Sequence, residues 1–221
     1  MIPIKQIEKH NHILIECDKK YFPQASVLYS YMLMCHKKVS LYSEDKSQRY
    51  SFLAWSDKVR IKAPSSADYT INAEFDILDL YTFLKKNEIT INKKMATALY
   101  AGFLERYDGF LSPLCDGTIF AILSELIEYG ADHILCVEQL TKKVPLSTYR
   151  LKAIVYKKLL LQNNAKRGYV SLVQEDFESS GAKWNDLWYI AKEILNLVHL
   201  KEVLIIKDDE KDKIINIKKE V

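Results

Sequence analysis

The sequence has few glycines and few cysteines, and the spacing of both excludes several kinds of site. None of its six glycines forms the GxGxxG or GxxxxGK spacing of phosphate-binding loops, and the GxSxG motif of serine hydrolases is absent as well. The four cysteines lie far apart in apolar surroundings and form no CxxC pair, which argues against disulfides and against zinc. We therefore expect buried thiols in a reducing compartment.

The sequence also lacks a bias toward one charge and lacks long apolar runs. Its 32 basic and 29 acidic residues are mixed along the chain and give a formal net charge of +3, unlike a strongly basic nucleic-acid-binding domain. No run approaches the roughly 18 apolar residues of a membrane span, and the N-terminus has no apolar segment behind a basic start. These absences predict a cytoplasmic protein without a membrane span.

The N-terminal part shows an alternation of strand and helix patterns. Short apolar runs at 12–17 and 38–43 predict strands, and they flank a segment at 24–36 that is apolar nearly all round and too long for a buried strand. A turn-like stretch then leads into a strand pattern at 68–74 and a helix pattern at 76–86. This alternation predicts an α/β fold whose parallel sheet is covered by helices.

From residue 91 onward the pattern is helical for about seventy residues, judged by apolar period and by capping residues. Asp116 is predicted to cap the start of one helix and Gly130 to end it, because aspartate accepts N-terminal N–H groups and glycine adopts positive φ. Pro145 is predicted to open the last helix of this region. The sequence thus predicts a helical middle that follows the parallel sheet.

A second domain is predicted after the polar segment 163–168, which ends in glycine and reads as a linker. Beyond it lie a strand pattern, a helix pattern and two further strand patterns joined by a charged turn. We expect residues 1–162 to form the α/β domain and residues 163–221 to form a small α+β domain, near the lower size of roughly fifty residues for independent stability.

Several phrases of the sequence resemble one family. The phrases are INKKMATALYAGFLERYDGF, FAILSELIEYGADHILCVEQLTKKVPLSTYRLKAIVYKKLLL and GYVSLVQEDFESSGAKWNDL, together with ASVLYSYMLMCHKKVSLY nearer the N-terminus. They resemble segments of DHH phosphoesterases of the oligoribonuclease and phosphoadenosine-phosphate phosphatase type, and the resemblance covers most of the chain. It implies a DHH-like N-terminal domain and a hydrolase with two manganese ions at the carboxyl ends of the sheet strands, held by aspartates and histidines.

The metal ligands of that family are largely replaced here. With Ser26 as the anchor, the first histidine of the family motif falls on Glu16, and its Asp-x-Asp pair falls on Lys20 and Phe22. The aspartate that ends the third strand falls on Glu74, the one conservative replacement. The Asp-His-His triplet that should follow is missing from the sequence. The resemblance therefore implies a degenerate family member.

Two further features support the same expectation. The last aspartate ligand of the family falls on Arg106, with Asp108 two positions later. We expect Arg106 to form a salt bridge with Glu16 or Glu74 that holds the altered site together, with the charged groups within about 4 Å. The family's glycine-rich phosphate clamp has no counterpart before the final KIINIKKEV, so we expect a truncated C-terminal domain.

Two functions remain open from the sequence. The first is a catalytically inactive homologue, without a cofactor, that acts through protein–protein interaction as a scaffold or regulator, with a protein partner or as a homodimer. The alternative is a phosphoesterase or binding protein for nucleotides or short RNA, with manganese if it is active. In that alternative Lys20 and Arg106 hold phosphate directly, as the bidentate geometry of arginine allows.

Overall fold

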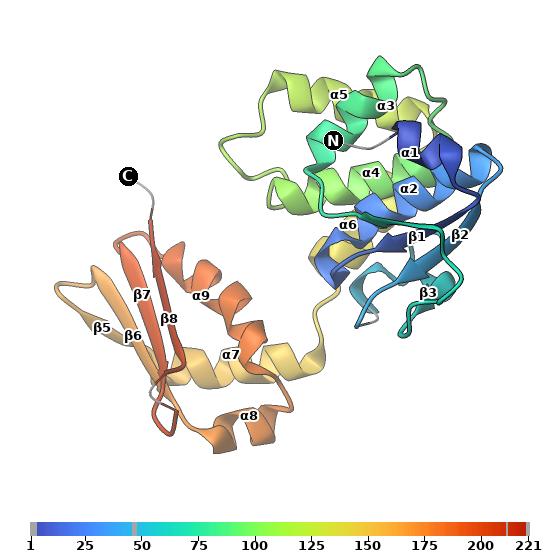
Figure 1. Ribbon diagram of the computed structural model, residues 1–221. Coiled ribbons are helices and arrows are strands. Elements are labelled where there is room, and N and C mark those ends of the chain that lie inside the picture. The colour runs from blue at the N-terminus through green and yellow to red at the C-terminus, as the bar shows by residue number, and fades with distance from the viewer. Residues whose placement is uncertain (1–3, 46–47, 211, 220–221) are drawn as a thin grey trace. The chain divides into compact units, whose positions relative to one another are not determined.

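The computed structural model describes residues 4–45, 48–210 and 212–219, and the chain forms two compact units, residues 1–143 and 144–221 (Figure 1). The division lies between residues 143 and 144, not at the predicted boundary of 162 and 163. The reason is the helix that follows Pro145, because its Leu151 and Val155 are fully buried in the core of the second unit.

Unit 1 is built on a four-stranded parallel sheet, as the sequence predicted. Its strands are β1 (His12–Glu16), β2 (Lys38–Tyr42), β3 (Val59–Arg60) and β4 (Tyr69–Asn72), in the order β3-β2-β1-β4. The register places Ile15 of β1 between Leu41 of β2 and Ile71 of β4, and all three side chains are buried. Because the strands are parallel, their carboxyl ends meet at one edge of the sheet.

Helices build the rest of unit 1. They are α1 (Ile4–Lys9), α2 (Phe22–Met34), α3 (Ile77–Lys86), α4 (Lys93–Arg106), α5 (Gly117–Glu128) and α6 (His133–Val137), which continues as a π-helical turn at Glu138–Lys142. Short 3-10 turns lie at Lys19–Tyr21, Gln48–Tyr50 and Ser56–Lys58. α2 lies between the sheet and α4 (Figure 1), and every residue from Phe22 to Met32 is buried. This central place explains why α2 is apolar nearly all round.

A glycine sets the close packing of the central helices. A Cβ on Gly102 of α4 would lie 2.6 Å from Cδ1 of Ile77 in α3 and 3.4 Å from Cβ of Pro23 in α2. Ile77 is 1% exposed, so its side chain has little room to move. The absence of a side chain at Gly102 therefore allows α2 and α3 to approach the same turn of α4.

The predicted helix ends in the middle of the chain are confirmed. Asp116 Oδ1 accepts hydrogen bonds from the backbone N–H groups of Thr118 and Ile119, at 3.0 and 3.1 Å, and so caps α5. Gly130 follows the end of α5 with a φ of 88°, which favours glycine. Pro145 directly precedes the next helix.

Unit 2 is a smaller α+β domain. Its helices are α7 (Leu146–Lys158), α8 (Gln174–Ser180) and α9 (Leu187–Leu195), with a 3-10 turn at Trp184–Asp186. Its sheet contains β5 (Leu160–Gln162), β6 (Arg167–Leu172), β7 (Glu202–Lys207) and β8 (Ile214–Lys218) in that spatial order. The central pair is parallel and the two outer pairs are antiparallel. Across the described parts of both units, no helix combines the length and apolar character that spanning a bilayer requires.

The segment 163–168, predicted as a linker, lies inside unit 2. It turns the chain from β5 into β6, which pair in antiparallel fashion, and its last two residues already belong to β6. Asn163, Asn164 and Ala165 all have positive φ, between 53° and 60°. Asparagine tolerates this conformation, so the polar sequence reflects a tight turn and not a boundary between domains.

Candidate functional site

A pocket opens at the carboxyl edge of the sheet in unit 1. Its volume is about 250 Å³, and its lining comes from the ends of β1, β2 and β4 and the loops that follow them. The lining residues are Glu16, Cys17, Asp18, Lys19, Tyr42, Ser43, Glu44, Asp45, Asn72 and Glu74. Open parallel sheets bind ligands at this edge, where neighbouring loops diverge.

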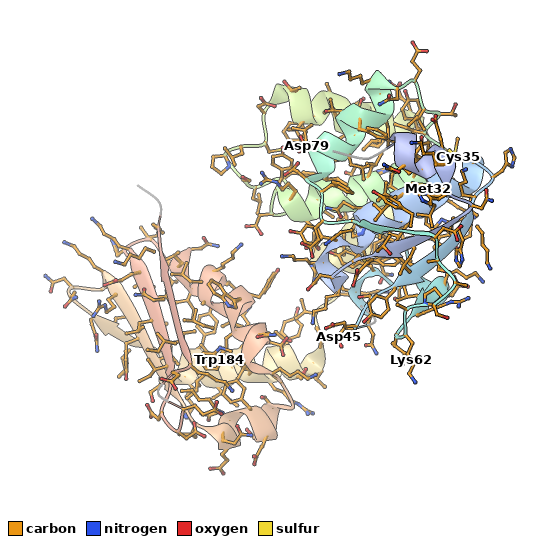
Figure 2. The ribbon with its side chains drawn as sticks, in the orientation of Figure 1. Met32, Cys35, Asp45, Lys62, Asp79 and Trp184 are labelled. Carbon is orange, nitrogen blue, oxygen red and sulfur yellow. The ribbon has the colours of Figure 1, made fainter. Side chains whose placement is uncertain are left out.

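The charge of this pocket is strongly negative. Five carboxylates line it, from Glu16, Asp18, Glu44, Asp45 and Glu74, and all five residues are exposed to solvent. The single lining lysine is Lys19, whose Nζ lies 3.6 Å from a carboxylate oxygen of Asp45. Figure 2 labels Asp45, which belongs to the loop after β2. Such a surface attracts cations and repels phosphate groups.

Hydrogen bonds between residues two positions apart fix the loops that carry these charges. The Oδ1 atom of Asp18 accepts from the backbone N–H of Lys20 at 3.0 Å and caps the first 3-10 turn. The side-chain oxygen of Asn72 accepts from the N–H of Glu74 at 2.9 Å. The Ser43 hydroxyl donates to the carbonyl of Asp45 at 3.0 Å. Each loop therefore leaves its strand in a defined direction, although its carboxylate stays in water.

The Cys17 side chain forms part of the lining and is 4% exposed. Burial raises the pKa of its thiol to about 12, and the negative charges of Asp18, Glu16 and Glu74 act in the same direction. A thiol with this pKa stays protonated near neutral pH, and the protonated form is a poor nucleophile. The pocket therefore does not offer an activated cysteine.

The side chains of the pocket do not fit the two-manganese centre that the resemblance implies. Among the described residues, no group of three or more histidine, cysteine, aspartate or glutamate side chains is arranged to hold a metal ion. A divalent transition ion needs several converging oxygen or nitrogen ligands to replace its water shell. The carboxylates here lie at the end of β1 and on the loops after β1, β2 and β4, and they do not converge in this way.

The structure brings together two of the five positions predicted for the altered metal site. Glu16 and Glu74 both line the pocket, whereas the other three positions lie outside its described lining. Phe22 is 4% exposed and belongs to the hydrophobic core. Lys20 places its Nζ 4.6 Å from the ring centroid of Tyr21. These two side chains are therefore held by neighbours in and around the first turn of α2.

Arg106 forms a salt bridge, but the predicted partner is wrong. Arg106 Nε donates to Asp76 Oδ2 at 2.9 Å, and the structure describes no ion pair within 4 Å between Arg106 and Glu16 or Glu74. The physical reason is local, because Arg106 ends α4 and Asp76 caps the start of α3, which packs beside α4. The guanidinium thus joins two helix ends.

Sequence reasoning missed most of the acidic lining. Asp18, Glu44 and Asp45 were not predicted, although each lies just after the end of a predicted strand, and neither was Asn72, the last residue of β4. The available signal was topological, because the carboxyl ends of adjacent parallel strands bring such residues to one edge. The spacing of the family motif instead points to Lys20, Phe22 and Arg106, which lie outside the described lining.

Comparison with known proteins supports the fold and goes no further. No known protein-family model matches the chain, and no curated protein sequence matches it. An exopolyphosphatase-related protein from Bacteroides fragilis superposes with a TM-score of 0.77 at 14% identity, over 96% of this chain and 79% of that protein. A putative family II inorganic pyrophosphatase from Methanococcus jannaschii gives a TM-score of 0.30 at 14% identity, over 79% of this chain and 58% of that protein, which is too low to carry an argument.

The first of these similarities identifies the architecture. The chain has a mixed α/β fold like that of the exopolyphosphatase-related protein, with a parallel four-stranded sheet and a second small sheet domain. The α/β architecture that the sequence predicted is therefore confirmed. Similarity of fold at this identity does not transfer an activity, so function must be argued from the site.

Proposed function

We propose that this protein is a DHH-like protein that does not hydrolyse phosphoesters and that acts by binding another protein, as a scaffold or regulator. The observation that carries this proposal is the chemistry of the pocket at the carboxyl edge of the sheet. Its described lining combines five carboxylates with one lysine and includes no histidine. Each requirement of metal-assisted phosphoester hydrolysis is poorly met by this set.

The first requirement is a pair of metal ions that produces a hydroxide nucleophile and neutralises the phosphate. Exposed carboxylates bind single hydrated cations weakly, because each ion keeps most of its water unless several ligands converge on it. The described side chains offer no such converging group. The pocket is therefore a poor site for a tightly held ion pair.

The second requirement is an environment that accepts a phosphate group. Without metal ions, each carboxylate at about 8–10 Å opposes a phosphate charge by on the order of 1–2 kcal/mol at an effective dielectric constant of about 20. Lys19 offsets a small part of this repulsion, because its ammonium group is already paired with Asp45. The charge of the pocket therefore disfavours phosphoesters as ligands.

The nucleotide-binding alternative loses the residues on which it depended. Arg106 donates to Asp76 instead of facing the pocket lining, and Lys20 lies over the ring of Tyr21. A phosphate would have to break the ion pair of Arg106 before it gained a bidentate contact. The geometry therefore favours the non-hydrolytic proposal.

The test measures metal binding and hydrolysis separately. Thermal unfolding is followed with and without manganese, and cleavage of a dinucleotide and of inorganic polyphosphate is assayed in the same buffers. We expect no manganese-dependent rise of the melting midpoint, since binding to the native state must raise it, and no cleavage. Glu16→Gln and Glu74→Gln are the site variants, and Glu128→Gln on α5 is an exposed control outside the pocket lining.

One result would overturn the proposal. It is a manganese-dependent midpoint shift, or cleavage, that both site variants remove and the control variant keeps. That result would mean that Glu16 and Glu74 hold a functional ion despite their exposure.

A further inference from the structure

Helix α7 carries a row of apolar side chains that points away from the core of unit 2. The row consists of Leu146, Tyr149, Ala153 and Tyr156, and we call it the α7 seam. Leu146, Tyr149 and Tyr156 are 64%, 54% and 37% exposed, and Ala153 is also exposed. Intervals of three, four and three residues place all four side chains along one side of a helix.

The opposite side of α7 is already used by the fold. Thr148, Leu151 and Val155 are buried, and the latter two belong to the core of unit 2. A surface helix with one buried side is expected to be polar on the other. The α7 seam is therefore apolar surface that unit 2 does not need for its own core.

The spacing of the α7 seam matches a contact with another helix. Alternating intervals of three and four residues form the ridge that packs against a neighbouring helix in coiled coils and in helix-binding grooves. The seam is one residue wide, whereas a helix that lies on a membrane presents a broad apolar face. Its geometry thus favours a helix over a lipid surface.

Charge along the borders of the α7 seam indicates the kind of helix. Arg150 and Lys157 are exposed, lie seven residues apart and border the same side of the seam. Among the described residues, neither of them forms an ion pair within 4 Å. On the other border Lys152 is neutralised by Glu193 of α9, with 2.5 Å between Nζ and Oε1. The border that contains Arg150 and Lys157 therefore carries positive charge that no described ion pair offsets.

We propose that the α7 seam binds an amphipathic helix of a partner protein whose apolar ridge is bordered by acidic residues. This inference rests on the interaction role proposed above and names the chemistry of the partner. Acidic side chains opposite Arg150 and Lys157 would set the orientation and speed the encounter, while the apolar ridge would cover the tyrosines. Partly exposed tyrosines are side chains that commonly anchor such contacts.

A second copy of the chain fits this surface less well. In an antiparallel pair of α7 helices centred on Ala153, Arg150 of one copy would lie beside Lys157 of the other, and this repulsion would occur twice. In a parallel pair, Lys157 would meet Lys152 of the second copy, whose charge Glu193 already offsets, so this border would supply no attraction. Like charges at these bordering positions disfavour pairing, so an acidic partner is the better complement.

The experiment uses the full chain and two synthetic helical peptides of about 21 residues, long enough to form helix on binding. Both peptides carry the same leucine ridge, and they differ in having glutamate or lysine at the bordering positions. Fluorescence anisotropy measures their affinity. We expect the glutamate peptide to bind at least about tenfold more tightly than the lysine peptide, and added salt to weaken it.

Variants then locate the binding surface. Tyr149→Ser combined with Tyr156→Ser should weaken the glutamate peptide about tenfold or more, whereas Phe120→Ser, a 53% exposed position on α5, should leave it unchanged. Arg150→Glu combined with Lys157→Glu should reverse the preference toward the lysine peptide. All five positions are exposed, and circular dichroism checks that each variant is folded.

Four outcomes would overturn the inference. Equal binding of both peptides, or binding of neither, would contradict the proposal that the partner is a helix with acidic borders. Dimerisation in sedimentation that the double tyrosine variant abolishes would assign the α7 seam to a second copy. Binding to phosphatidylserine vesicles that the same variant abolishes would assign it to a membrane surface. None of these readouts involves manganese or hydrolysis, so this inference and the non-hydrolytic proposal fail separately.

Discussion

Glu125 of α5 joins two helices of unit 1, and its neutralisation is predicted to destabilise that unit in a pH-dependent way. Its carboxylate accepts hydrogen bonds from Lys85 of α3 at 2.5 Å and from the hydroxyl of Tyr129, which directly follows α5, at 2.5 Å, and also from the hydroxyl of Tyr81 in α3. The Lys85 contact, followed by the two tyrosine contacts, lowers the pKa of Glu125 from 4.5 to about 2. The perturbation is Glu125→Gln, which removes the charge and keeps the size.

The magnitude follows from the depressed pKa and from exposure. A shift from 4.5 to about 2 corresponds to an upper limit of roughly 3 kcal/mol, at about 1.36 kcal/mol per pKa unit. The side chains of Lys85 and Glu125 are 43% and 29% exposed, so solvent screens much of this interaction. We therefore expect Glu125→Gln to lower the free energy of unfolding of unit 1 by about 1–2 kcal/mol at pH 7.

The sign of the pH dependence is fixed by the direction of the shift. Because the folded pKa of Glu125 lies below its unfolded value, the stabilisation is fully present above about pH 4.5 and is lost as the pH falls toward about 2. The assay is urea denaturation followed by the fluorescence of Trp55, in a Trp184→Phe, Trp188→Phe background that leaves Trp55 as the one tryptophan. The difference between parent and variant should be constant from pH 7 to pH 5 and then shrink.

The matched control is Glu128→Gln, an exposed glutamate at the last residue of α5. It removes the same charge from the same helix but should change the free energy of unfolding by less than about 0.5 kcal/mol. A Glu125→Gln effect no larger than that of Glu128→Gln at pH 7, or one that does not change with pH, would refute this account of the contact.

Four further substitutions test the packing, the corrected ion pair and the turn. Gly102→Ala should destabilise unit 1 by about 1–2 kcal/mol in urea, since its Cβ would overlap Ile77; an unchanged midpoint would show that the helices can separate there. Arg106→Ala should cost about 0.5 kcal/mol and Asp76→Ala about 1–2 kcal/mol, because Asp76 also caps α3; equal losses would contradict that double role. Ala165→Gly should stabilise unit 2 by about 0.5–1 kcal/mol, because Ala165 has a φ of 60°; a lower unfolding free energy would refute this.

The sequence predicted those parts of the fold whose structure is determined by residues close together in the chain. The strands around β1 are short apolar runs, and α2 is too long and too uniformly apolar to be anything but a buried helix. Asp116 and Gly130 mark the ends of α5 by their own hydrogen-bonding and φ preferences. Each of these features depends on a few neighbouring residues, so the chain itself contains the information.

The parts that the sequence did not predict depend on contacts between distant residues. β5 is three residues long and begins two residues after the end of α7. In the sequence its leucines look like a continuation of that helix, and only their pairing with β6 in the structure shows that they form a strand. The boundary at residue 143 depends on which core receives Leu151, and periodicity shows that a residue is buried without showing where. The partner of Arg106 lies thirty residues away, at a helix cap that the sequence does not link to it.

The pocket shows why the fold of this chain does not determine its activity. The sheet needs apolar residues such as Ile13 and Ile15 inside β1, and many sequences meet that need, which is how a TM-score of 0.77 arises at 14% identity. The chemistry at the edge depends on a handful of side chains that the core does not constrain, because Glu16, Asp18 and Glu74 are exposed. Substitution there leaves the architecture intact and changes the charge that a ligand meets. The proposed absence of hydrolysis therefore rests on the acidic lining and not on the shared fold.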